Sequence, residues 1–244
     1  METQIRHAQI VGLLFVLTLS LGCGSTGSSV STTFGLTDSS RSDSQMGSPL
    51  RTPEGYTARC QRDWVDLSDV VLPIAEEFEA QNIMYGSREL SDCSGIFHRF
   101  LRAFDDECPG YSLPSAGSFR ASRDIAGWYD RKGLMTMVWD PLSLAHLIKP
   151  GAVMFYVPGN QDYGPRDKDH VLSRVVHVGV VVSVQRDFQG NPTSYRLFHG
   201  RSSGKPASIT DFHRREPSRS NHKPFGNWDQ QWIAIAPLVD GDEL

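Results

Sequence analysis

The spacing of apolar residues changes partway along this chain, and the change limits the folds that it can adopt. Apolar residues first recur at helical spacing, around 66–81 with Pro73 near the middle and again from Ile96 to Phe104. Short apolar runs typical of strands follow at 153–157, 174–182, 195–199 and 232–236. Helices first and strands afterwards predict an α+β domain in which N-terminal helices pack on an antiparallel β-sheet.

The N-terminus has the pattern of an export signal. Residues 1–23 begin with a short polar stretch, and the apolar run that follows ends at Leu21, which is short for a membrane span. The last five residues, Leu19 to Cys23, resemble the lipobox of bacterial lipoproteins, although Ser20 stands where leucine is usual. The resemblance implies an exported protein that is lipid-anchored through Cys23 to a membrane of the bacterial cell envelope. An ordinary signal peptide cleaved nearby is the alternative.

Composition separates a linker from a folded domain. Residues 24–55 are dominated by Ser, Thr and Gly, which predicts a flexible linker, and residues 56–244 are long enough for one domain. The net charge of −4 and the pI near 6.0 argue against nucleic acid as a partner. The basic stretch 213–223 is expected to be a solvated loop, with contact to an acidic substrate as the alternative.

A cysteine stands at the head of the second helical segment, in the sequence SDCSGIF. Asp92 is a suitable N-cap, so Cys93 is expected at the positive end of a helix. That position favours a thiolate, and a neighbouring cationic histidine would lower the pKa of the thiol further. The alternative is a small buried cysteine with a structural role only.

The chain has four cysteines, and its export affects how they can pair. If Cys23 carries lipid, Cys60 and Cys108 can close a disulfide and leave Cys93 free. The sequence does not fix this connectivity. It contains no CxxC, HxH or HExxH spacing, so neither a metal site nor a cofactor is expected.

Two histidines are candidates for the base that a reactive cysteine needs. His177 and His199 lie on consecutive predicted strands, and their midpoint, Phe188, falls in a turn-forming segment. In an antiparallel hairpin the two side chains should therefore lie opposite or nearly opposite one another. Gly179 lies on the same face as His177 and leaves space there. The remaining histidines are expected at the surface: His98, His146, His170, His213 and His222.

These features together resemble the NlpC-type cysteine peptidases of the bacterial cell wall. The resemblance covers about residues 83–200 and the final strand. Its motifs are Asp92-Cys93-Ser94-Gly95, Leu113-Pro114, Arg120-Ala121-Ser122, Pro150-Gly151, His177-Val178-Gly179 and Phe198-His199. It implies a papain-like fold with Cys93 as nucleophile, His177 as its base and His199 orienting that base. It also implies that the backbone N–H of Cys93 is one donor to the oxyanion.

The resemblance implies an exported cysteine peptidase that cleaves amide bonds in peptidoglycan stem peptides, commonly between D-glutamate and a diamino acid. Two departures stand out. The family's oxyanion tyrosine would fall near Asn82 or Ile83, so Tyr85 is its nearest candidate, and Ala152 replaces the acid of the family's Pro-Gly-Asp motif. Two alternatives therefore remain open: an inactive cell-wall-binding lipoprotein of the same fold, and an amidase or deamidase that acts on another amide.

Overall fold

The computed structural model describes residues 67–160, 163–215, 223–227 and 229–240. The predicted signal peptide, the predicted linker and the first residues of the predicted domain lie outside these ranges. Among the helices inside them, none has the length and apolar character needed to cross a membrane.

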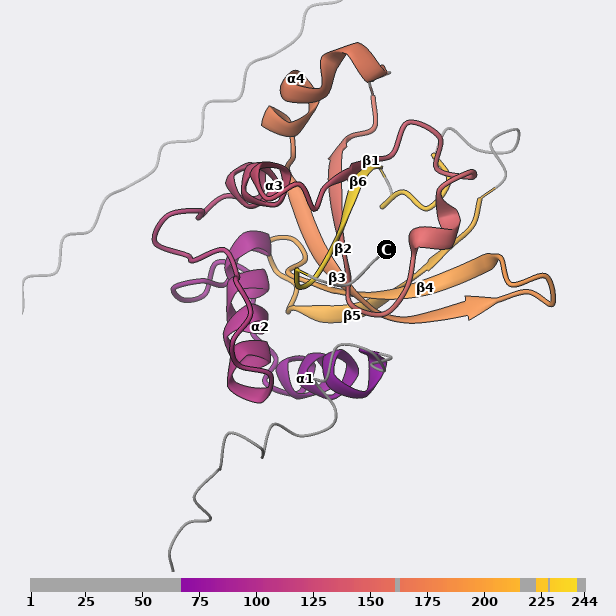
Figure 1. Cartoon of the computed structure of the whole chain (residues 1–244). Helices are drawn as coiled ribbons and strands as arrows, with labels where there is room; N and C mark the ends of the chain where they lie inside the picture. Colours follow the sequence, from indigo (N-terminus) through magenta and orange to yellow (C-terminus); the bar gives the residue numbers. More distant parts are fainter. Residues whose placement is uncertain (1–66, 161–162, 216–222, 228, 241–244) are drawn as a thin grey trace, which may run out of the picture. The chain divides into compact units, whose positions relative to one another are not determined.

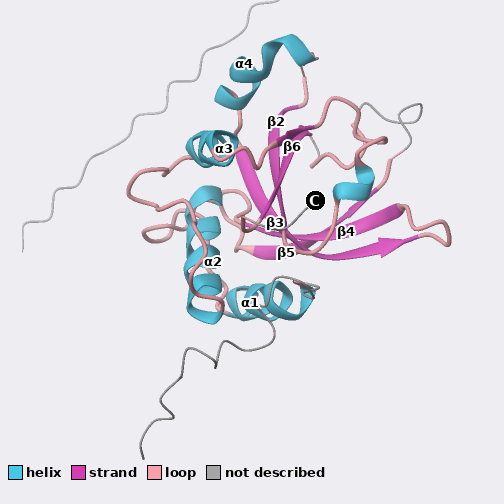
Figure 2. Ribbon diagram, viewed as in Figure 1, coloured by secondary structure: helices cyan, strands magenta, loops and turns pink. Residues whose placement is uncertain are grey.

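Both predicted helices are present. Helix α1 (Ser68–Ala80) contains Pro73 and buries one face, and α2 (Cys93–Glu107) begins after the predicted N-cap, Asp92. The two helices contact each other and the sheet, as Figure 2 shows. The sequence patterns did not predict α3 (Ser122–Arg131) or the short α4 (Lys168–Ser173).

The sheet has six antiparallel strands, in the order β1-β6-β2-β3-β4-β5 (Figure 1). The strands are β1 (Thr136–Met137), β2 (Ala152–Pro158), β3 (His177–Arg186), β4 (Pro192–His199), β5 (Ser208–His213) and β6 (Gln230–Pro237). The predicted class, helices followed by an antiparallel sheet, is therefore confirmed. Strands β2, β3, β4 and β6 match the predicted runs, whereas β1 and β5 were not predicted.

Both faces of the sheet are buried, and alternation along each strand separates them. Val178, Val180 and Val182 of β3 belong to the core formed with α1 and α2. Val181 and its β4 partner Leu197 belong to a second core on the other face. Because side chains alternate along a strand, His177 starts β3 on the face of Val181.

The register of the β3–β4 hairpin differs slightly from the predicted one. Val180 pairs with Phe198 and Val181 with Leu197, so the register of this end of the hairpin places Gly179, not His177, opposite His199. The pairing shifts by one residue between Val181 and Ser183 and again near the turn, and such irregularities cannot be located from a midpoint. The offset of two residues keeps both histidines on one face as diagonal neighbours.

Candidate active site

The start of α2 is fixed by a small polar network. The Asp92 carboxylate accepts a hydrogen bond from the backbone N–H of Gly95 at 2.7 Å and one from Arg120 at 2.9 Å. Arg120 also donates to Ser94 Oγ at 2.7 Å. A Cβ on Gly95 would lie 2.5 Å from the backbone of Leu90, which explains the glycine. The motif Asp92-Cys93-Ser94-Gly95 thus holds Cys93 in a fixed place at the helix terminus.

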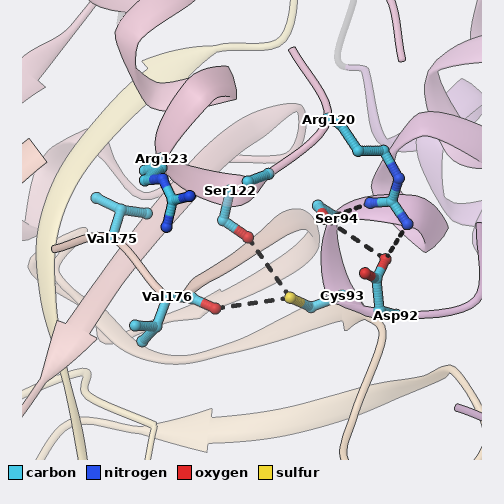
Figure 3. A pocket seen from close by; sticks show the side chains of 9 residues that line it. Asp92, Cys93, Ser94, Arg120, Ser122, Arg123, Val175 and Val176 are labelled. Atoms are coloured by element: carbon cyan, nitrogen blue, oxygen red, sulfur yellow. Dashed lines mark hydrogen bonds and ion pairs between the residues drawn. The ribbon is translucent and has the colours of Figure 1, made fainter. Parts of the chain in front are cut away.

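The Cys93 sulfur opens into a pocket between α2, α3 and the start of β3 (Figure 3). It lies 3.5 Å from Ser122 Oγ and donates to the carbonyl oxygen of Val176 at 3.6 Å. The pocket has a volume of about 480 Å³, within the range of small-ligand sites. Its lining residues are Asp92, Cys93, Ser94, Arg120, Ala121, Ser122, Arg123, Val175 and Val176.

The structure brings His177 and His199 together. His177 Nε2 lies 2.8 Å from His199 Nδ1, and the rings are nearly perpendicular, at 86°. His199 Nε2 lies 3.0 Å from Thr210 Oγ1 on β5. Tyr156 packs near the ring of His177 and Phe212 near that of His199, and both histidines are buried. Gly179 provides the expected space, because its Cβ would lie 2.8 Å from Leu197 Cγ.

Cys93 lies against the sequence neighbours of both histidines. The sulfur contacts the carbonyl of Val176, the residue before His177. A Cβ on Gly200, the residue after His199, would lie 2.7 Å from the Cα of Cys93. Within the described residues the sulfur's hydrogen-bond partners are Ser122 and Val176, and neither histidine is one of them. The predicted approach of the sulfur to an imidazole nitrogen of His177 therefore stays a prediction.

Burial controls the protonation of these groups. Burial raises the pKa of the Cys93 thiol; the hydrogen bond with Ser122 is the next largest influence and opposes that rise, and the Asp92 carboxylate adds to it. Burial lowers the pKa of His177 to about 4, and burial together with neighbouring His177 lowers the pKa of His199. The expectation of a lowered thiol pKa at the helix terminus is therefore wrong for this structure, because desolvation outweighs the helix field. Burial thus favours the neutral form of the thiol and of both imidazoles.

Tyr85 lies close enough to the site to respond to its charges. Burial raises the pKa of its phenol first, followed by the negative charges of Cys93 and Asp92. Its backbone N–H is bonded to the carbonyl of Lys205 at 3.1 Å. The role of Tyr85 as an oxyanion donor stays a prediction.

Two further assignments can be compared with the structure. Cys108 is disulfide-bonded, and Cys93 is the free cysteine of the described residues. Cys60 and Cys23 lie outside these residues, so their pairing and lipidation stay predictions.

His98 is buried and forms a hydrogen bond with the carbonyl of Phe119 at 2.8 Å, so its assignment to the surface was wrong. No cluster of metal-ligating side chains occurs in the described part of the chain.

Sequence reasoning missed the residues that contact the candidate groups from distant segments. Ser122 appeared only as part of a loosely matching motif, and Thr210 gave no signal because the pattern of β5 was not predicted. Val176 lay within a predicted strand, whereas it is 46% exposed and precedes β3. These contacts depend on tertiary structure, which local patterns do not encode.

The low pKa of His177 predicts that the protein loses stability in weak acid. The unfolded chain protonates His177 near its ordinary pKa of 6.5, whereas the folded chain does so only near 4. The stabilising contribution is thus fully present above about pH 6.5 and is lost as the pH falls towards 4. We expect this histidine alone to lower the free energy of unfolding by about 2 kcal/mol between pH 7 and pH 5.

Urea unfolding at both pH values measures this loss. His177→Gln should reduce the pH dependence, and His146→Gln, at an exposed position, should not. Equal pH dependence in the wild type and His177→Gln would contradict the assignment of a buried neutral His177.

Comparisons with protein-family models, with curated proteins and with solved structures found no match for this chain.

Proposed function

We propose that this chain is an exported cysteine hydrolase that cleaves amide bonds in peptidoglycan stem peptides. The observation that carries the proposal is that Cys93 lies against the sequence neighbours of two hydrogen-bonded histidines. The N-terminal cysteine of α2 lines a pocket, its sulfur contacts the residue before a buried histidine, and a second histidine holds that first one. A cysteine at the start of a helix and two paired histidines on an antiparallel sheet also support a papain-like fold as part of this proposal.

The proposed reaction begins with proton transfer. In the tautomer whose ring proton lies on Nε2 and is donated to His199 Nδ1, His177 Nδ1 has a lone pair for the thiol proton. To deliver that proton, the thiol must leave the Val176 carbonyl and turn towards the imidazole. The thiolate then attacks the amide carbon, and a sulfur–carbon bond forms.

Backbone groups at the start of α2 suit the charge that develops next. The first N–H groups of a helix have no partner within the helix, and those of Cys93 and Ser94 act to lower the pKa of the thiol. In the proposed mechanism Cys93 N–H stabilises the oxyanion, and Tyr85 is the candidate for a second donor. Imidazolium His177 protonates the leaving amine as the carbon–nitrogen bond breaks, and water hydrolyses the thioester.

The decisive experiment is digestion of purified cell wall with the purified full chain. Mass spectrometry should find new amine ends within the stem peptides, and their position would identify the bond. Release of ammonia without chain cleavage would instead identify an amidase or deamidase. If no new end or ammonia appears under conditions in which the chain is folded, the hydrolase proposal is wrong.

A binding function is the second candidate, and two observations favour it. The Cys93 thiol donates a hydrogen bond to the Val176 carbonyl and not to an imidazole, and burial raises the pKa of this thiol. An inactive cell-wall-binding lipoprotein would tolerate both. The proposed membrane anchor is common to both functions, and fatty-acid labelling of the wild type but not of Cys23→Ala would support it.

A further inference from the structure

Beyond the two histidines, the hydrogen-bonded chain continues to a third residue. His177 Nε2 bonds to His199 Nδ1, and His199 Nε2 bonds to Thr210 Oγ1 at 3.0 Å. Ser208 pairs with His199 across β4 and β5, yet its hydroxyl oxygen is buried without a partner, so it does not hold the histidine. Within the described residues, Thr210 is the side chain that holds the outer nitrogen of His199.

The number of protons on the two histidines determines which atom donates in each of these hydrogen bonds. When His177 carries the thiol proton it is an imidazolium, and both of its ring nitrogens are donors. His199 Nδ1 must then accept from His177 Nε2. Neutral His199 has one ring proton, which must therefore lie on Nε2 and point at Thr210 Oγ1. Burial first, and then the charges of His177 and Arg201, oppose a second proton on His199.

We propose that Thr210 is a positioning residue that accepts a hydrogen bond from the Nε2–H of His199 and thereby keeps the Nδ1 lone pair of His177 free. This inference rests on the proposed function for its role in catalysis, but the hydrogen-bond direction can be tested without any substrate. Thr210 suits the role because it is only partly buried, so its hydroxyl can accept from His199 while it donates to water. Its effect is greatest when His177 is charged, because hydrogen bonds in a charged chain are the stronger ones.

The variant that isolates this hydrogen bond is Thr210→Val. Valine has nearly the same shape and suits a strand, but it cannot accept a proton. Thr210→Ser keeps the hydroxyl and should behave like the wild type. Thr193→Val on β4 is the matched control, because the hydroxyl of Thr193 bonds to the carbonyl of Gln185 at 3.2 Å in an exposed part of the hairpin.

Nitrogen NMR of ¹⁵N-histidine in the full chain reports the direction directly. In the wild type, Thr210→Ser and Thr193→Val, His199 should be a neutral imidazole with its proton on Nε2. Thr210→Val should move a substantial share of that proton to Nδ1, because an N–H without an acceptor is costly. The rate at which iodoacetamide alkylates Cys93 near pH 7 should fall by about tenfold in the same variant, as expected for one lost hydrogen bond to a charged group.

The outcomes separate the two proposals. A wild type with the His199 proton on Nδ1 would overturn the role of Thr210, and so would an unchanged spectrum and alkylation rate in Thr210→Val. If the NMR result holds but no form of the chain digests cell wall, the positioning assignment stands and the hydrolase proposal fails. A loss of folding in Thr210→Val, seen by circular dichroism, leaves Thr210→Ser and wild-type NMR to decide the hydrogen-bond direction.

Discussion

Cys93→Ala is expected to reduce cell-wall hydrolysis by about 10⁴-fold or more, because it removes the proposed nucleophile and with it the covalent step. Folding should change little, since Cys93 is only partly buried and Asp92 still caps α2 through Gly95 N–H. Binding to sedimented cell wall should also persist, because the proposed contacts with the substrate include pocket residues other than Cys93. The measurement is the rate at which new amine ends appear.

Ser122→Ala is the matched control for that substitution. It removes the hydroxyl that lies 3.5 Å from the sulfur but leaves the sulfur in place, so activity should fall by about tenfold at most. If Cys93→Ala hydrolyses cell wall at the wild-type rate, Cys93 is not the nucleophile. Normal binding without hydrolysis in every form, wild type included, would instead favour the binding function.

His177→Ala is expected to reduce hydrolysis by about 10²- to 10⁴-fold, the usual contribution of a general base. The same change should slow alkylation of Cys93 by iodoacetamide near pH 7. This second result is informative because burial raises the pKa of the Cys93 thiol, so a thiol without help from His177 would react slowly. Mass spectrometry of the peptide that contains Cys93 measures alkylation at this position alone.

The control for His177→Ala is His146→Ala, at an exposed histidine outside the pocket. This variant should match the wild type in both assays. If Cys93 reacts slowly at every pH below about 9 and His177→Ala changes nothing, then the cysteine and histidine do not act together, and the site is inactive in this structure.

The start of α2 could be predicted from sequence because its chemistry is local. Asp92 caps a helix whose apolar residues follow at regular spacing, and the capping hydrogen bond spans only three residues. The β3–β4 hairpin was predicted for the same reason, since its strands are consecutive and its turn is marked by composition. The histidine pair could be placed on one face because a two-residue offset preserves alternation.

The remainder of the candidate site depends on contacts between distant segments. Strand β5 has only one fully buried position in its six residues, so it shows no clear apolar pattern, and Thr210 could not be placed beside His199. The sequence suggested that the positive end of α2 lowers the pKa of the Cys93 thiol. Desolvation raises this pKa instead, and it depends on how deeply the thiol is buried. That depth is set by α3 and by the start of β3, which local spacing does not place around the cysteine.

The contact between Cys93 and Val176 also has a kinetic consequence, because it joins positions 83 residues apart. Closing a flexible loop of that length costs about 4 kcal/mol in chain entropy, which the docked sheet must offset. The site is therefore expected to form late in folding, after α2 and the strands have come together. A nascent chain that ends before β3 carries the thiol without either histidine. The incomplete chain would then hold its proposed nucleophile without the proposed base.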